Sequence, residues 1–228
     1  MKTNENRLYR ILSAVIAVLV PFFLIIFAVR VMINPLFARI EYARPNFPPD
    51  EYGFTREERG AYSRYAILYL VNNADIDYLG DLTFPDGSPL FNQRELDHMV
   101  DVKVLITWLL NIWYGVTFLL GALLIWFRRT QRWTQFRRAV GTGGIVTIAA
   151  LSFVGLLVAI NFQWFFTQFH YIFFEGDTWL FFSSDTLIRL FPMEFWLDAA
   201  IGVILITLIG AGLLIWQGHR AKTNSPQA

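Results

Sequence analysis

Two of the three histidines stand where they could transfer protons. His98 precedes one long apolar stretch and His170 follows another, whereas His219 lies in the C-terminal tail. Histidine has an ordinary pKa close to neutrality, which suits general acid–base work. Asp101 follows His98 by three residues, so on a helix it could orient the imidazole. Asp177 follows His170 by seven residues. Up-down connectivity can bring the two span ends together, so His98 and His170 are expected to converge as a candidate proton-transfer site with these two carboxylates nearby. The alternative interpretation is that each is a hydrogen-bonded histidine of the interfacial belt.

Three further charged residues near the same segments are candidate substrate-binding groups. Asp185 and Arg189 are four residues apart, with Ser184 as an expected N-cap, and the simplest interpretation is a helix-stabilising pair. Arg189 could instead donate hydrogen bonds to a lipid headgroup or a carbonyl oxygen. Lys103 opens an apolar stretch and could extend towards phosphate, which is also ordinary for the end of a membrane span.

Several other chemistries are excluded or remain alternatives. The absence of cysteine excludes disulfides, thiolate metal sites and cysteine nucleophiles. Nucleophilic-serine, zincin and phosphate-loop motifs are also missing. Two histidines in a helical bundle could bind haem, or zinc together with acids, but we expect no cofactor and no metal. A non-enzymatic membrane protein whose outer cap binds lipid or a partner protein is a further alternative. A nucleic-acid partner is not expected.

Composition predicts a membrane protein. The chain has 228 residues, of which 55% are hydrophobic and only 16% charged, against about 25% charged in soluble domains. Four apolar stretches reach the roughly 20 residues that cross a bilayer. The expected order is a tail and first span (1–33), an outer cap segment (34–103), a second span (104–127), a basic cytoplasmic loop (128–143), a third span (144–166), a second outer segment (167–194), a fourth span (195–217) and a cytoplasmic tail (218–228). The predicted class is an all-α membrane protein, a four-transmembrane-helix bundle with an extracytoplasmic cap of short helices and strands.

Charge predicts the orientation of these spans. Basic residues gather in the short flanks that face the cytoplasm. The two tails and the loop 128–143 together hold ten basic residues and one acid, a net charge of +9. The remaining nine basic residues face seventeen acids, a net charge of −8. Both termini are therefore expected in the cytoplasm, and both candidate histidines at the outer leaflet.

The outer cap segment has its own local signals. Alternating apolar residues over 36–42 favour a short strand. A capping-box pattern at Thr55 begins a helix expected to reach about residue 72. The stretch 82–91 contains Pro-Asp-Gly and suggests a turn between two extended pieces. A second capping-box pattern at Asn92 begins a helix expected to continue without a break into the second span.

Three segments of the sequence resemble a known family. They read ELDHMVDVK from Glu95, HYIFFEGDTWL from His170 and SDTLIRLFPMEFW from Ser184. Together with four spans and a long first outer segment, they are similar to the lipoprotein intramolecular transacylase (Lit) family of bacterial membrane proteins. The resemblance extends over nearly the whole chain.

The resemblance implies a reaction and a location. Such enzymes lie in the bacterial cytoplasmic membrane, where they contact membrane lipid and act on diacylglyceryl lipoproteins. They move the sn-2 acyl chain to the α-amino group of the modified cysteine and leave a lyso-form lipoprotein. The motifs place the two central histidines at His98 and His170, with acid and base unassigned. Arg189, Lys103 or backbone amides near Gly176 could then stabilise the oxyanion.

Overall fold

The computed structural model describes residues 2–176 and 178–223. The chain divides into two compact units. The first unit comprises Met1–Val29, Leu110–Ala159 and Gly202–Ala228, and the second comprises Arg30–Leu109 and Ile160–Ile201. Both histidines of interest therefore belong to the second unit.

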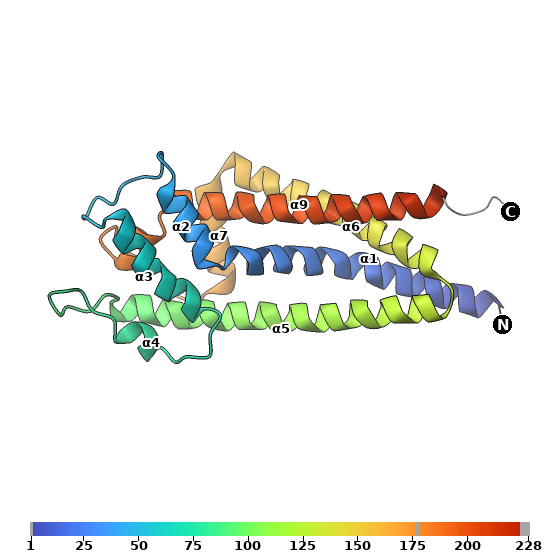
Figure 1. Cartoon of the computed structure of the whole chain (residues 1–228), viewed down its shortest axis with the longest axis horizontal. Coiled ribbons are helices and arrows are strands. Elements are labelled where there is room, and N and C mark those ends of the chain that lie inside the picture. Colours follow the sequence, from blue (N-terminus) through green and yellow to red (C-terminus); the bar gives the residue numbers. More distant parts are fainter. Residues whose placement is uncertain (1, 177, 224–228) are drawn as a thin grey trace. The chain divides into compact units, whose positions relative to one another are not determined.

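Long helices dominate the fold. They are α1 (Lys2–Met32), α5 (Gln93–Arg129), α6 (Trp133–Ile160) and α9 (Met193–Thr223), and Figure 1 shows each of them. In the described part of the chain, these four are long and apolar enough to cross a membrane. The predicted all-α class with four membrane helices is thus confirmed.

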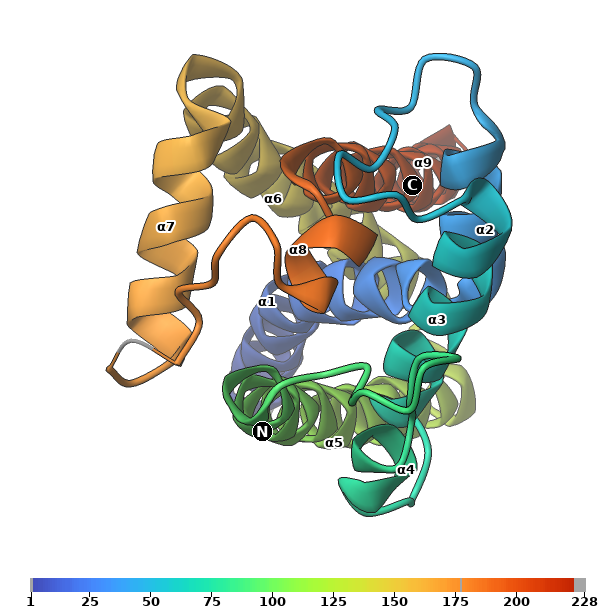
Figure 2. The same ribbon diagram turned by 90° about the vertical axis from the view of Figure 1, so that its left-hand side faces the viewer.

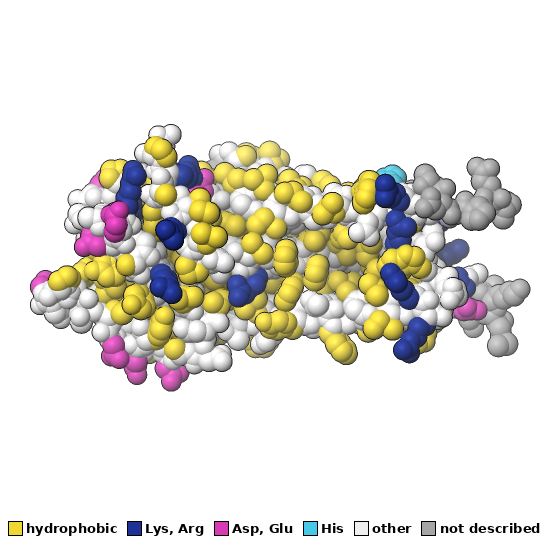
Figure 3. All heavy atoms as spheres, in the orientation of Figure 1, with side chains coloured by type: hydrophobic (Ala, Val, Ile, Leu, Met, Phe, Trp, Pro, Cys, Tyr) yellow, Lys and Arg dark blue, Asp and Glu magenta, His cyan; other side chains and the backbone are white. Residues whose placement is uncertain are grey.

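The first unit is a helical bundle with a small apolar core. Its buried residues include Ile16, Phe127 and Ala211 from three of the long helices. Gly144 lets α6 and α9 approach closely, because a Cβ there would lie 2.7 Å from the carbonyl oxygen of Ala211. Basic side chains gather at the end of this unit where α1 begins and α9 ends, whereas most acidic side chains belong to the second unit, together with further basic ones (Figure 3).

The second unit contains the shorter helices. These are α2 (Pro35–Ala43), α3 (Arg56–Tyr69), α4 (Asp77–Gly80), α7 (Phe162–Phe173) and α8 (Thr186–Leu190). In the view of Figure 2, α8 lies between α7 on one side and α2 and α3 on the other. Tyr42, Leu79, Leu90 and Leu190 share one buried core, so α2, α4 and α8 pack together with the start of α5.

The strand predicted over residues 36–42 is wrong. These residues form α2, which Asn34 caps by accepting a hydrogen bond from the Leu36 amide at 2.9 Å. Pro35 occupies the first helical position, where its missing N–H costs nothing. Ala38 and Tyr42 then fall on one buried helical face. Among the described residues the only β-structure is an isolated bridge between Thr83 and Pro89, across the predicted turn.

The third apolar stretch is two helices instead of one span through residue 166. α6 ends at Ile160, and Asn161 adopts an extended conformation with φ −158°. Its side chain accepts a hydrogen bond from the Trp164 amide at 2.9 Å and caps α7. The break arises because Asn favours the N-cap position, where its side chain bonds the first amides of a new helix, over a position inside a helix.

Both predicted capping boxes are confirmed. Thr55 and Glu58 bond each other's backbone amides at the start of α3. Asn92 and Glu95 do the same at the start of α5, with distances of 2.8 and 3.1 Å. α5 then continues without interruption to Arg129, as the pattern predicts.

Candidate functional site

His98 lies in the second turn of α5. The capping box at Asn92 and Glu95 begins the helix and thereby sets the direction in which His98 points. Its side chain is only 8% exposed. The ring centroids of Phe174 and Phe181 lie 4.9 and 5.3 Å away in edge-on orientations. His98 is therefore enclosed by aromatic surface.

His170 lies in the last turn of α7 and is 9% exposed. Its Nδ1 is 2.7 Å from the carbonyl oxygen of Phe166, one turn earlier. Burial lowers the pKa of His170 below its ordinary value of 6.5, and the hydrogen bond to Phe166 opposes this only in part. At neutral pH the ring is thus uncharged, with Nδ1 donating to the carbonyl and Nε2 as the acceptor.

The two histidine rings face each other within the second unit. Their centroids are 6.1 Å apart and their planes are inclined by 23°. Around them lie Phe166, Phe174, Trp179 and Phe181, each within 5.4 Å of one histidine or both. We call these six residues the histidine cluster. The predicted convergence of His98 and His170, 72 residues apart in the sequence, is what the structure displays.

Two buried polar atoms of this cluster are unsatisfied. Among the described residues, neither Nδ1 of His98 nor Nε1 of Trp179 has a hydrogen-bond partner. Buried polar groups in proteins are nearly always paired, and an exception commonly marks a functional position. The cluster therefore offers a hydrogen-bonding nitrogen and an N–H donor in apolar surroundings.

The supporting residues predicted on α5 point elsewhere. Asp101 is exposed, and no hydrogen bond joins its carboxylate to His98 in the described structure. Lys103 donates to the carbonyl oxygen of Ala74 at 2.5 Å and to Asn72 at 3.3 Å. Its ammonium also lies 3.9 Å from the centroid of Tyr69. Lys103 thus ties the segment after α3 to α5 and does not face the histidines.

Asp185 has a role at a chain junction. It is the N-cap residue of α8, in place of the expected Ser184. Its carboxylate accepts hydrogen bonds from the Phe182 amide at 2.9 Å and from the Asn92 side chain at 3.0 Å. Asp185 therefore joins the segment before α8 to the start of α5, and it does not pair with Arg189.

Arg189 pairs with a carboxylate that sequence spacing did not indicate. Its Nη2 lies 2.9 Å from Asp50, and it also donates to the carbonyl oxygen of Tyr52 at 3.3 Å. Arg59 donates to the carbonyl oxygens of Arg189 and Pro48 at 2.6 to 2.9 Å. We call Asp50, Arg59 and Arg189 the arginine network. Arg59 is 4% exposed, and nothing in the local pattern around it could have indicated this long-range role.

Asp177 falls outside the described residues. Its neighbour Gly176 has a φ of 65°, a left-handed conformation that glycine adopts without strain. The turn at Gly176 carries the chain from the end of α7 back to Trp179, whose ring centroid lies 5.0 Å from that of His170. No local pattern in the sequence indicates a role for Trp179.

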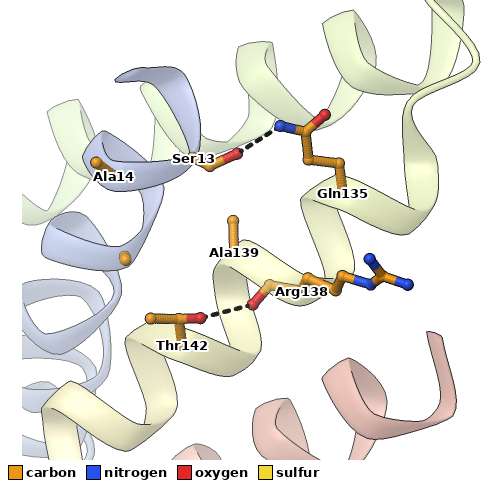
Figure 4. Close-up of a pocket in the computed structure, with 7 residues that line it drawn as sticks. Ser13, Ala14, Gln135, Arg138, Ala139 and Thr142 are labelled. Atoms are coloured by element: carbon orange, nitrogen blue, oxygen red, sulfur yellow. Dashed lines mark hydrogen bonds between the residues drawn. The ribbon is translucent and has the colours of Figure 1, made fainter. Parts of the chain in front are cut away.

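A cavity in the first unit is a weaker candidate site. It has a volume of about 300 Å³ and lies between α1 and α6 (Figure 4). In it, the Gln135 amide donates to the hydroxyl of Ser13, and Thr142 donates to the carbonyl oxygen of Arg138. Its lining contains no histidine and no acid. Among the described residues, no group of three or more acids and histidines could hold a metal ion. The histidine cluster is thus the better site for proton transfer.

The chemistry open to the histidine cluster is acid–base catalysis on a substrate that brings its own nucleophile. Two close imidazoles can take a proton from one atom and supply one to another. The apolar surroundings exclude water and strengthen hydrogen bonds to developing charge. No serine, threonine or lysine nucleophile belongs to the cluster.

Comparisons with known proteins agree on one family. The model of the lipoprotein intramolecular transacylase family Lit matches residues 14–196. An uncharacterized protein from Aquifex aeolicus (strain VF5) is 28% identical over 222 residues, which is 93% of this chain and 95% of that protein.

Solved structures agree as well. The membrane integral lipoprotein intramolecular transacylase Lit from Bacillus cereus superposes with a TM-score of 0.83 at 23% identity, covering 98% of this chain and 100% of that one. A variant of it with a histidine replaced by alanine gives a TM-score of 0.79 at 22% identity, covering 99% of both chains. The chain therefore belongs to the lipoprotein intramolecular transacylase (Lit) family and is an acyltransferase of the membrane.

Proposed function

We propose that this acyltransferase moves the sn-2 acyl chain of a diacylglyceryl-cysteine to the α-amino group of the same cysteine, with His98 and His170 as the acid–base pair. The observation that carries the proposal is the facing pair of buried imidazoles, 6.1 Å apart. The amine and the ester belong to one substrate, so bringing them together supplies much of the rate acceleration. The protein then needs only to transfer protons and to stabilise the charge that develops in the transition state.

His170 is the better candidate for the base. A neutral imidazole whose Nδ1–H is held by a carbonyl presents a basic Nε2. The carbonyl of Phe166 lies in position for this, at 2.7 Å from Nδ1. His170 can therefore accept the proton that the α-amine loses as it attacks.

His98 is then the group that donates a proton to the leaving oxygen. When the tetrahedral intermediate collapses, the ester C–O bond breaks and the glyceryl oxygen must gain a proton. Over the whole reaction one N–H and one C–O bond are broken, and one C–N and one O–H bond are formed. No net proton is consumed, so two histidines within one cluster are sufficient for the exchange.

Helix lengths and side chains are consistent with a reaction at the outer leaflet of the bacterial cytoplasmic membrane, with both termini in the cytoplasm. α5 has 37 residues and is about 55 Å long, whereas the hydrocarbon layer is about 30 Å thick. Its first turns, which carry His98, can therefore extend past the hydrocarbon. α7 is too short to span, and it exposes Trp164, Tyr171 and Phe173, which is typical of helices at the interface.

Mass spectrometry of lipoprotein N-termini tests the reaction. The chain is expressed in a bacterial host that lacks other N-acylating enzymes, and N-terminal lipopeptides are analysed. We expect N-acyl, S-monoacylglyceryl cysteine with the wild type, and only diacylglyceryl cysteine with His98→Ala or His170→Ala. His219→Ala, an exposed histidine in α9, is the matched control and should convert normally. If the wild type leaves every amine free, the chain does not catalyse this transfer.

The orientation has its own test, because the chain contains no cysteine. Asp86→Cys places a thiol in the exposed turn of the second unit, and Thr134→Cys places one in the first turn of α6. We expect a membrane-impermeant maleimide to label the first variant in intact spheroplasts and the second only after lysis. The reverse pattern would place the histidines on the cytoplasmic side.

A further inference from the structure

We propose that the indole N–H of Trp179 donates a hydrogen bond to the carbonyl oxygen of the substrate ester and stabilises the oxyanion that forms there. This inference rests on the proposed function, because it assigns a further catalytic residue to that reaction. It concerns a buried residue whose N–H group has no hydrogen-bond partner among the described residues.

Trp179 is buried with an unused donor. Its side chain is 8% exposed, and Nε1 has no hydrogen-bond partner among the described residues. Indole Nε1–H is a donor only, so a bound acceptor oxygen is the simplest partner that would satisfy it. A tryptophan needed only for packing would more commonly direct its N–H to a backbone carbonyl.

The position of Trp179 suits contact with the reacting atoms. Its ring centroid lies 5.0 Å from that of His170, with the planes inclined by 35°. Tyr171 also packs edge-on against Trp179, at 5.0 Å between centroids. Arg94 donates to the carbonyl oxygen of the next residue, Leu180, at 3.1 Å and so holds this segment to α5. Trp179 is therefore held beside the base by both helices that carry histidines.

The cationic donors expected from the sequence are engaged elsewhere. Arg189 is paired with Asp50, and Lys103 is bonded to Ala74 and Asn72. Besides the backbone amides near Gly176, the oxyanion then needs an N–H donor from the histidine cluster, and Trp179 has one without a partner among the described residues. A neutral donor held in apolar surroundings suits charge that appears only in the transition state.

The step is balanced as follows. The amine nitrogen bonds to the ester carbonyl carbon, the carbonyl π pair moves onto oxygen, and the amine proton passes to His170. The oxygen accepts the Trp179 N–H hydrogen bond while it is negatively charged. When the carbonyl reforms, the C–O bond to the glyceryl oxygen breaks and that oxygen takes a proton from His98. His98 regains a proton from His170, so both imidazoles return to their starting state. Trp179 neither gains nor loses a proton.

Replacement of a single atom group tests this role. Site-specific incorporation of 3-benzothienylalanine at position 179 of the full-length protein exchanges the indole N–H for sulfur and keeps the ring shape. The assay uses a synthetic dipalmitoylglyceryl-cysteine peptide in detergent micelles. We expect kcat to fall about 100-fold, or about 2.7 kcal/mol, with KM changed less than about twofold. The same analogue at Trp164, an exposed residue of α7, should leave kcat unchanged.

The outcomes separate this inference from the proposed function. If the wild type converts the peptide and the residue-179 analogue converts it equally fast, Trp179 is not the donor and the proposed function stands. If the analogue loses activity only through a higher KM or a lower melting temperature, Trp179 serves packing and the inference is overturned. If the wild type itself does not convert the peptide, both fail.

Discussion

The histidine cluster, with its buried His98 and His170, and the arginine network, with its buried Arg59, both belong to the second unit, but their polar atoms are satisfied to different degrees. In the arginine network, Arg59 bonds two backbone carbonyls and Arg189 bonds Asp50 and Tyr52. In the histidine cluster, Nδ1 of His98 and Nε1 of Trp179 have no partner within the described structure. A satisfied network stabilises a fold, whereas unsatisfied buried atoms require an explanation, which here is the proposed binding of a substrate.

The largest expected effect separates catalysis from stability in the histidine cluster. His98→Ala or His170→Ala should lower the rate of acyl transfer by about 10³-fold, because each removes a proton-transfer group. For His98→Ala the melting temperature in detergent should change by no more than a few degrees, because Nδ1 of His98 has no hydrogen-bond partner among the described residues. For His170→Ala it should fall further, because the hydrogen bond to the Phe166 carbonyl is lost. Equal losses of activity and of folded protein would contradict this contrast.

The opposite behaviour is expected in the arginine network. Arg59→Met should lower the free energy of unfolding by about 3 kcal/mol, because the carbonyls of Pro48 and Arg189 lose their buried donor. The transfer rate per folded molecule should stay within about twofold of the wild type. Arg56→Met, an exposed substitution on the same helix, is the matched control for denaturation in detergent. A large loss of rate with unchanged stability would place the network in the active site.

Acidification should affect the two regions in different pH ranges. The folded state keeps His170 neutral below pH 6.5, while the unfolded chain binds a proton there, so stability should fall as the pH drops from 6.5. Burial raises the pKa of Asp50, but its hydrogen bonds from Arg189 and from the Phe54 amide outweigh burial and leave its pKa below 3.8. The contribution of Asp50 is therefore present above pH 3.8 and lost only below it.

Thermal unfolding from pH 7 to pH 3 measures this difference. We expect His170→Gln to flatten the stability profile between pH 6.5 and 4, and Asp50→Asn to leave that range unchanged. The transfer rate of the wild type should persist at pH 6.5 and then fall about tenfold per pH unit once His170 is protonated. A rate that halves at pH 6.5 or above would contradict a lowered pKa.

A smaller effect is expected at Lys103, which holds the segment after α3. Lys103→Met removes the hydrogen bonds to Ala74 and Asn72 and should cost about 1 kcal/mol of stability. Transfer should change less than about threefold in the lipopeptide assay. A rate loss near 100-fold would show that the ammonium group reaches the substrate after all.

The smallest effect is expected at Asp101. Asp101→Asn should leave both the melting temperature and the transfer rate within about twofold of the wild type, because this exposed carboxylate has no bond to His98. A pH–rate profile shifted by the substitution would instead restore the orienting role that helical spacing suggested.

Local signals in the sequence predicted much of the fold. Two capping boxes, the long helix from Asn92 into the second span and the turn at 82–91 are all present. Errors arose where two local signals conflicted. Alternation over residues 36–42 suggested a strand, but Asn34 and Pro35 form a stronger helix start. Asn161 broke a stretch whose hydropathy alone looked continuous.

Some features of the candidate site could likewise be predicted from the sequence, and others could not. The pairing of His98 with His170 could be expected from their places at the ends of neighbouring spans and from the family motifs. The partner of Arg189 could not, because helical spacing favoured Asp185, four residues away, whereas Asp50 is 139 residues away. Trp179 also left no local signal, because a tryptophan in an aromatic segment is ordinary at a membrane interface.

The sequence by itself determined the membrane helices, the separation of basic from acidic residues and the presence of two histidines near span ends. These properties follow from composition and from periodicities within single helices. Only the tertiary structure decided which polar atoms are saturated and which remain free. A hydrogen bond between distant segments depends on the path of the chain between them. Here that path supplies partners to Arg59 and Arg189, while within the described residues Nδ1 of His98 and Nε1 of Trp179 have none.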